Sequence, residues 1–255
     1  MGHIPLHSEF SALAAVKDLE RRWGLTLVSF VPSGSAAPLL RLQELVQKML
    51  DRHLAVRPDE PLVEFYDAEQ LHCTQLTLTR SSAWGPVRLA DFVKPGIDPQ
   101  QLCNILARET EGLGNITVRL DRLVLSENGF QLFGACADED SVGRRFRLLE
   151  RLNTQLPCYF NLSRRAWDTD PARHGFVHMR LGFVKRLCSD YESLVAEVAR
   201  SSIEPITLSF ADVTVVHHRY RSLLAPHAGS LRFPLNSRAR DDRAVPSFGH
   251  LNLLR

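Results

Sequence analysis

Two histidines in this chain are each followed, two positions later, by a side chain that can bind a phosphate oxygen. His72 precedes Thr74, and His178 precedes Arg180. A neutral imidazole accepts a proton near neutral pH and its conjugate acid donates one, so two histidines can serve as base and acid in one reaction. A hydroxyl and a planar guanidinium both suit phosphate oxygens. These residue types therefore indicate acid–base chemistry on a phosphoryl group, without a requirement for a metal ion.

Both motifs lie in segments with the pattern of β-strands. In residues 71–79 and 176–184, β-branched and apolar residues recur with a period of two. Side chains at positions i and i+2 of a strand point to the same face. Each histidine is thus expected to share a face with its polar partner, while Leu71, Cys73 and Gln75 point to the opposite face. Either histidine alone is more typical of a structural or solvated side chain, but the matched pair favours a functional site.

The doubled motif resembles the signature of the 2H phosphoesterase superfamily, the two-histidine enzymes that include the 2′-5′ RNA ligase-like and cyclic phosphodiesterase families. That signature is H-x-[S/T]-x followed by hydrophobic strand residues, and it occurs twice. Residues 65–78 look like the first copy, and residues 176–183 look like the second. The resemblance covers roughly residues 25–222. It departs from the family at one position, where Arg180 replaces Ser or Thr.

The resemblance implies a fold and a reaction. The fold would be α+β and bilobal, with two similar antiparallel-rich sheets flanked by helices around a central cleft. The substrate would be a 2′,3′-cyclic phosphate at an RNA end or on a nucleotide. His72 and His178 would be the catalytic pair, and Thr74 and Arg180 would bind the phosphate. The motifs do not indicate which histidine is the base, and we expect no cofactor and no metal.

Arg180 leaves two hypotheses open. It could strengthen phosphate binding in an active hydrolase. It could instead indicate a protein that binds a nucleotide or an RNA end without turning it over, because a hydroxyl and a guanidinium place their hydrogen-bond donors at different distances from the backbone. A third hypothesis is an unrelated α+β protein with structural histidines, which predicts that the two imidazoles lie far apart.

The composition limits the classes of partner. The 255 residues include 31 Lys and Arg against 29 Asp and Glu, a net charge of +2 that is too balanced for a broad duplex-DNA-binding surface. Five cysteines without a C-x-x-C pair indicate reduced thiols rather than a disulfide framework or a zinc ribbon. The chain shows neither the apolar segment of a signal peptide nor a run long enough to cross a membrane. We therefore expect a cytoplasmic protein without membrane contact, and a monomer.

The predicted elements follow an order that roughly repeats in the second half of the chain. Apolar periodicity predicts helices at residues 10–23, 37–54, 98–112, 142–156 and 189–200. Strands are predicted at residues 25–31, 63–66, 71–79, 116–125, 130–137, 176–184 and 206–217. We therefore expect a single bilobal domain over residues 1–229. Residues 230–255 are rich in Arg, Asp, Ser and Pro and are predicted to form a tail or a loosely packed wrap.

A cluster of arginines gives a weaker functional signal. The predicted helix at 142–156 carries Arg144, Arg145, Arg147 and Arg151. These side chains could form a track for RNA, but charged helix faces are more often simply solvated. The chain has no P-loop, dinucleotide-binding or esterase-elbow motif.

Further histidines have alternative interpretations. His174 and His178 have the spacing of helical metal ligands, but the residues between them favour an extended chain, in which that spacing separates the side chains. His217 and His218 are adjacent, so on a strand only one of them could face a cleft. Residues 219–221, Arg-Tyr-Arg, could stack a base and bind phosphate, although a solvated strand end is the more common alternative.

Overall fold

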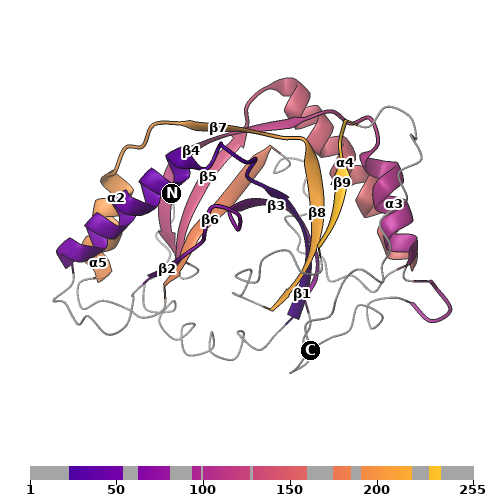
Figure 1. Ribbon diagram of the computed structural model, residues 1–255, viewed down its shortest axis with the longest axis horizontal. Helices are drawn as coiled ribbons and strands as arrows, with labels where there is room; N and C mark the ends of the chain where they lie inside the picture. The colour runs from indigo at the N-terminus through magenta and orange to yellow at the C-terminus, as the bar shows by residue number, and fades with distance from the viewer. Residues whose placement is uncertain are drawn as a thin grey trace.

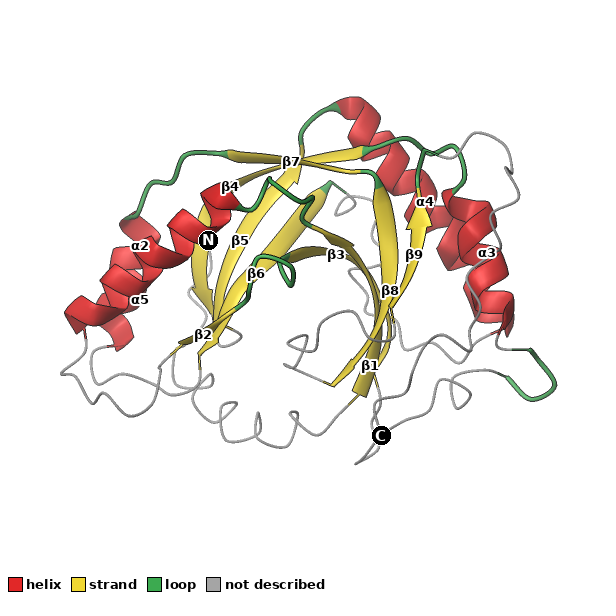
Figure 2. Cartoon of the chain, in the orientation of Figure 1, coloured by secondary structure: helices red, strands yellow, loops and turns green. Residues whose placement is uncertain are grey.

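The computed structural model shows a strongly curled antiparallel sheet with helices on its outer side (Figures 1 and 2). It describes residues 23–53, 63–80, 94–98, 100–126, 129–159, 175–184, 191–219 and 230–236. Within these residues, nine strands form one sheet and four helices accompany it. The predicted α+β class is therefore confirmed.

The sheet runs in the order β7-β4-β5-β6-β3-β1-β8-β9, and β2 pairs with β6 off this path. The strands are β1 (Trp23–Phe30), β2 (Val63–Phe65), β3 (His72–Arg80), β4 (Ile116–Ser126), β5 (Gly129–Cys136), β6 (Phe176–Val184), β7 (Ile206–Phe210), β8 (Asp212–Arg219) and β9 (Ser230–Pro234). The helices are α2 (Ala37–His53), α3 (Gln100–Thr110), α4 (Glu139–Tyr159) and α5 (Tyr191–Arg200). Every strand pairing is antiparallel.

Two half-sheets meet where β3 pairs with β6. One half contains β1, β3, β8 and β9, and the other contains β2 and β4 to β7. A single residue pair, Cys73 with Met179, joins the halves in register. The two antiparallel sheets predicted for a bilobal fold are thus continuous with each other through one narrow junction.

The helices pack against one face of the curled sheet, and the hydrophobic core lies between them and that face. Cys73, Met179 and Leu132 are completely buried and belong to the same apolar cluster as Val46 of α2 and Leu148 of α4. Figure 2 shows α2 and α5 on one outer flank and α3 and α4 on the other. The opposite, inner face of the sheet is therefore the face that the described helices leave uncovered.

Most predicted elements occur close to their expected bounds, with two corrections. The strand predicted at 206–217 is two strands that break at Ala211, because β7 pairs with β4 while β8 pairs with β1 in the other half-sheet. Helix α4 begins at Glu139 rather than at Val142, since the Asp138 carboxylate accepts a hydrogen bond from the Ser141 backbone amide (2.6 Å) and caps the helix. The helix predicted at 10–23 lies outside the described residues except for Trp23, which begins β1.

Part of the C-terminal segment is integrated into the sheet. Strand β9 pairs with β8 along its whole length. Phe233 and Leu235 are buried, and the Leu235 amide donates to the carbonyl of Ala211 (2.8 Å). Residues 230–236 therefore form an edge of the first half-sheet, and residues 237–255 lie outside the description.

The described cysteines that can be assigned are unpaired thiols. Cys73 and Cys103 are buried, Cys136 is partly buried, and none of the three forms a disulfide. Burial raises the pKa of Cys73 and of Cys103 to about 12, which keeps both thiols protonated. The described helices include none with the length and apolar character needed to cross a membrane.

Candidate functional site

The junction between the half-sheets brings the two histidine motifs together. Cys73 of β3 and Met179 of β6 are directly opposite each other, and both side chains belong to the core cluster. Because side chains alternate along a strand, the residues on either side of this pair point to the opposite face. We call this inner face the polar face. It carries the four residues predicted from the sequence, His72 and Thr74 on β3 and His178 and Arg180 on β6.

The antiparallel register turns these four residues into two cross-strand pairs. Continuing this antiparallel register by one residue on each side sets His72 opposite Arg180 and Thr74 opposite His178. Directly opposite residues of an antiparallel pair have Cβ atoms about 4.5–5.5 Å apart, and diagonal neighbours are about 7–8 Å apart. The two histidines are diagonal neighbours. They therefore lie on one face of adjacent strands rather than in distant parts of the molecule.

His72 is buried in an aromatic environment that holds the ring in a defined orientation. It is 5% exposed and makes edge contacts with the rings of Phe30 (5.8 Å between centroids) and Tyr66 (5.6 Å). Its Nδ1 lies 2.6 Å from the Gln70 carbonyl oxygen. A carbonyl can only accept, so Nδ1 carries the proton, and Nε2 of the neutral ring keeps a lone pair.

Burial and a neighbouring cation keep this ring neutral. The pKa of His72 is lowered from 6.5 to about 4, chiefly by burial and also by the positive charge of Arg180, while the hydrogen bond to the Gln70 carbonyl opposes both. The charge effect of Arg180 agrees with its position opposite His72 in the register. At neutral pH, His72 is therefore a proton acceptor that faces a guanidinium.

His178 has a more open environment. Its side chain is half-buried and stacks on Phe133 of β5, with 5.9 Å between ring centroids and 29° between planes. Phe133 is its cross-strand partner in the β5 and β6 pairing. The Arg122 guanidinium carbon lies 5.7 Å from the centroid of the same Phe133 ring. The ring of His178 is thus supported on one side while part of it stays accessible.

Arg180 has an unusual environment for a half-buried cation. Its guanidinium carbon lies 4.7 Å from the centroid of the Phe183 ring. Its Nε is buried and has no hydrogen-bond partner, and no carboxylate among the described residues pairs with it. A buried donor on a cation normally finds an acceptor, so the unpaired Nε of Arg180 is an unusual feature of the polar face.

Each motif is followed immediately by a β-bulge. In β3, Leu76 pairs with Leu27 and Thr74 pairs with Val28, which leaves Gln75 without a partner in the ladder. In β6, the pairing with β5 similarly passes over Leu181, the residue after Arg180. A bulge inserts one residue, bends the strand and re-aims the side chains beside it. Both copies of the motif therefore end in the same backbone irregularity.

A buried polar side chain from a helix holds each bulge. Arg145 of α4 donates from Nε to the Gln75 side-chain oxygen (3.0 Å) and from Nη2 to the Gln75 carbonyl (3.4 Å). Gln43 of α2 donates from Nε2 to the carbonyls of Leu181 (3.0 Å) and Tyr66 (2.7 Å). Arg145 thus gives Gln75 a partner inside the core, and Gln43 adds a second donor to the Leu181 carbonyl, which also accepts from the Tyr66 backbone amide (2.9 Å).

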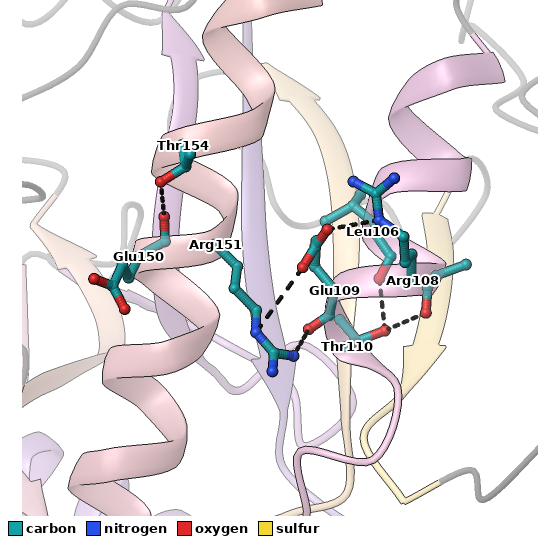
Figure 3. Close-up of polar contacts among 8 residues, drawn as sticks. Leu106, Arg108, Glu109, Thr110, Glu150, Arg151 and Thr154 are labelled. Carbon is teal, nitrogen blue, oxygen red and sulfur yellow. Dashed lines mark hydrogen bonds and ion pairs between the residues drawn. The ribbon is translucent and has the colours of Figure 1, made fainter.

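The arginine cluster predicted on the outer face of α4 is therefore corrected at one position. Arg145 is 2% exposed and points into the core rather than to solvent. Arg147 and Arg151 are exposed, and Arg151 lies near Glu109 of α3, with 3.9 Å between Nε and the carboxylate (Figure 3). The interpretation of a solvated face holds for these two arginines. The sequence pattern gives no sign that Arg145 and Gln43 support the site, because the bulges that they hold appear only in the strand pairing.

Several predicted groups lie outside what the structure describes. His174 and residues 220–221 are not described, and neither are the side chains of His217 and His218 at the end of β8. Among the described residues, no three His, Cys, Asp or Glu side chains are grouped to hold a metal ion. The polar face as described therefore consists of the four predicted residues and their aromatic and amide neighbours.

The low pKa of His72 makes stability depend on pH. The folded value, about 4, lies below the unfolded value of 6.5, so the unfolded chain binds the extra proton between these values. The free energy of unfolding should fall by about 3 kcal/mol as the pH falls from about 6.5 to about 4. Chemical denaturation at several pH values will measure this. His72→Gln should remove that share of the pH dependence, and equal profiles for wild type and variant would contradict the assignment.

Loss of Arg145 should destabilise the fold through the bulge in β3. Arg145→Met introduces an apolar side chain of similar length, and it leaves the side-chain oxygen and the carbonyl of Gln75 without the donor that Arg145 supplies. We expect a loss of about 1–3 kcal/mol in the free energy of unfolding, measured by urea titration. Arg147→Met on the exposed side of the same helix is the matched control and should change stability by less than about 0.5 kcal/mol. Equal losses in both variants would refute the structural role.

Comparison with known proteins gives similarity at the level of the fold. No protein-family model and no curated protein sequence matches the chain. Usb1 from Kluyveromyces marxianus is 14% identical, covers 85% of this chain and 99% of its own, and has a TM-score of 0.47. E. coli LigT complexed with phosphate is 12% identical, with coverages of 84% and 95% and a TM-score of 0.38. A structure described as a phosphoesterase is also 12% identical, with coverages of 83% and 94% and a TM-score of 0.37.

At this level of identity and TM-score, only the chain's own residues bear on what it does. The solved structures to which this chain is similar in fold include a phosphoesterase.

Proposed function

We propose that this chain is a phosphodiesterase of the 2H type that hydrolyses a 2′,3′-cyclic phosphate at an RNA end or on a nucleotide. The observation that supports this most strongly is the pairing of Cys73 with Met179, which sets two H-x-[T/R] motifs side by side on the polar face. Two imidazoles and two phosphate-binding side chains in one patch are sufficient for acid–base hydrolysis of a phosphodiester.

His72 is the better candidate for the general base. It is neutral over the physiological pH range, and its Nδ1 proton is engaged with the Gln70 carbonyl, so Nε2 can accept a proton. In the proposed reaction, a water oxygen attacks phosphorus and gives its proton to His72. The ribose oxygen departs as the P–O bond breaks and takes a proton from His178. The product is a phosphomonoester, and the two histidines exchange protons with solvent before the next turnover.

Thr74 and Arg180 would bind the non-bridging oxygens during this displacement. Negative charge accumulates on these oxygens as water adds, so a fixed cation and a fixed hydroxyl stabilise the transition state more than the ground state. The buried Nε of Arg180 lacks a partner in the protein and could donate to one such oxygen. A bound phosphate would also offset the positive charge that lowers the pKa of His72.

The second candidate is a nucleotide or RNA-end binding protein without turnover. The observation in its favour is Arg180 itself, which stands where related motifs have a hydroxyl. Burial lowers the pKa of His72 to about 4, and the charge of Arg180 contributes to this shift. A base with so low a pKa has little driving force for proton abstraction. Binding would then persist while the chemical step is slow.

Turnover of 2′,3′-cyclic nucleotides in the presence of EDTA separates these candidates. We expect hydrolysis that continues in the presence of the chelator. Its rate should fall by about 10²–10⁴-fold in both His72→Ala and His178→Ala, as measured by chromatography of the monoester product. His53→Ala, which removes a histidine paired with Glu197 between α2 and α5, is the control and should retain activity. Binding of the cyclic nucleotide without product in the wild type would favour the second candidate. Full activity in either site variant would refute the assignment of the pair.

The pH profile tests the role of His72 as base. The acidic limb of kcat/KM reports the base of the free enzyme, which must be unprotonated to act. Since the pKa of His72 is about 4, kcat/KM should hold as the pH falls through 6 and decline only near pH 4. Initial rates at substrate concentrations below KM, from pH 3.5 to 8, measure this. An acidic limb near pH 6.5 would assign the base to a different group.

A further inference from the structure

The polar face continues from β6 to β5, where a third polar side chain lies beside Arg180. Gln131 of β5 is the direct cross-strand partner of Arg180. The next residue, Leu132, pairs with Met179 and lies in the core, so Gln131 points to the same face as Arg180 and His72. Three strands thus contribute one row of side chains, with His72, Arg180 and Gln131 in succession.

Gln131 differs from the other buried glutamines of the described chain. Gln43, Gln70, Gln75 and Gln131 are each no more than 8% exposed. The first three have hydrogen-bonded side chains: Gln43 binds two carbonyls, Gln70 accepts from the Asp67 amide, and Gln75 binds Arg145. The Gln131 amide has no such bond with any residue of the described chain.

The Gln131 amide is accessible on the polar face. Among the described residues, the buried side-chain N or O atom that lacks a hydrogen-bond partner is Arg180 Nε, so the amide atoms of Gln131 keep contact with the surface. Its neighbours in β5, Phe130 and Leu132, are both fully buried apolar residues. An accessible carboxamide beside a cation can bind a ligand oxygen.

Two unpartnered donors lie side by side here. The Arg180 Nε is buried without an acceptor, and the Gln131 carboxamide next to it carries two N–H donors. A phosphoryl group offers several acceptor oxygens and can accept from both side chains at once. A ligand that bridges these donors would lie directly in front of His72, the other neighbour of Arg180.

We propose that Gln131 is a third phosphate-binding residue, whose carboxamide donates a hydrogen bond to a non-bridging oxygen held by Arg180. This assignment rests on the proposed function for the identity of the ligand. Gln131 supplies from β5 the neutral donor that the second motif lacks, since Arg180 stands in the place of a hydroxyl. The anion site is therefore shared by three adjacent strands.

Gln131→Leu and Gln131→Glu test this proposal with inorganic phosphate as the probe, measured by calorimetry, and with thermal unfolding in parallel. Loss of one hydrogen bond to a charged group weakens binding, so phosphate affinity should fall by about 10- to 100-fold in Gln131→Leu. Gln131→Glu adds a negative charge to the site and should bind more weakly still. Because the amide has no partner in the described chain, the unfolding temperature of Gln131→Leu should stay equal or rise.

The exposed Gln47 of α2, whose side-chain amide donates to Asp51 on the same helix, provides the matched control. Gln47→Leu should leave phosphate affinity unchanged. A lower unfolding temperature in Gln131→Leu with unchanged phosphate affinity would make Gln131 a structural residue and overturn the proposal. Unchanged phosphate affinity with a raised KM for the cyclic nucleotide would also overturn it, because Gln131 would then contact another part of the substrate.

The outcome is independent of turnover. If the wild type binds phosphate but does not hydrolyse cyclic nucleotides, the hydrolase proposal fails while the affinity of Gln131→Leu still decides the role of Gln131. If the wild type does not bind phosphate, the assignment of Gln131 fails directly.

Discussion

The architecture of the site depends on one backbone pairing. Two half-sheets curl toward each other and meet at Cys73 and Met179, which pair in register and are both buried in the core. Alternation of side chains then places every neighbour of this pair on the opposite face. A register shift of one residue would turn His72 and its partners into the core and bring apolar side chains to the inner face. Burial of two apolar side chains therefore fixes the position of the polar ones.

Buried polar side chains on the helix-covered face of the sheet stabilise the bent backbone of β3 and β6, and they lie on the face opposite the two histidines. Each motif ends in a bulge, at Gln75 in one half and at Leu181 in the other. Each bulge is held by a buried side chain from the helix behind it, Arg145 in one case and Gln43 in the other. In both halves a helix side chain thus binds the bulge, although the residue types differ. The matching bulges agree with two half-sheets of similar plan.

The inner face differs, because some of its donors are not used within the described chain. His72 is buried and neutral beside a cation, the buried Nε of Arg180 lacks an acceptor, and the amide of Gln131 has no hydrogen bond with a described residue. Burial of His72 and of the unpaired Arg180 Nε costs folding free energy. Such groups commonly persist where a ligand completes their bonds, and an anion is the ligand that two adjacent donors and a neutral imidazole would favour together.

The sequence by itself determined the strands and their faces, because period-two patterning shows which side chains are buried. It therefore predicted that His72 shares a face with Thr74 and that Gln75 points the other way, as the bonds of Gln75 to Arg145 confirm. Only the tertiary structure decided that Arg145 lies inside, that residues 206–217 cross between the halves, and that Gln131 lies beside Arg180. These facts depend on register and bulges between strands far apart in the chain, and local periodicity carries no information about such pairings.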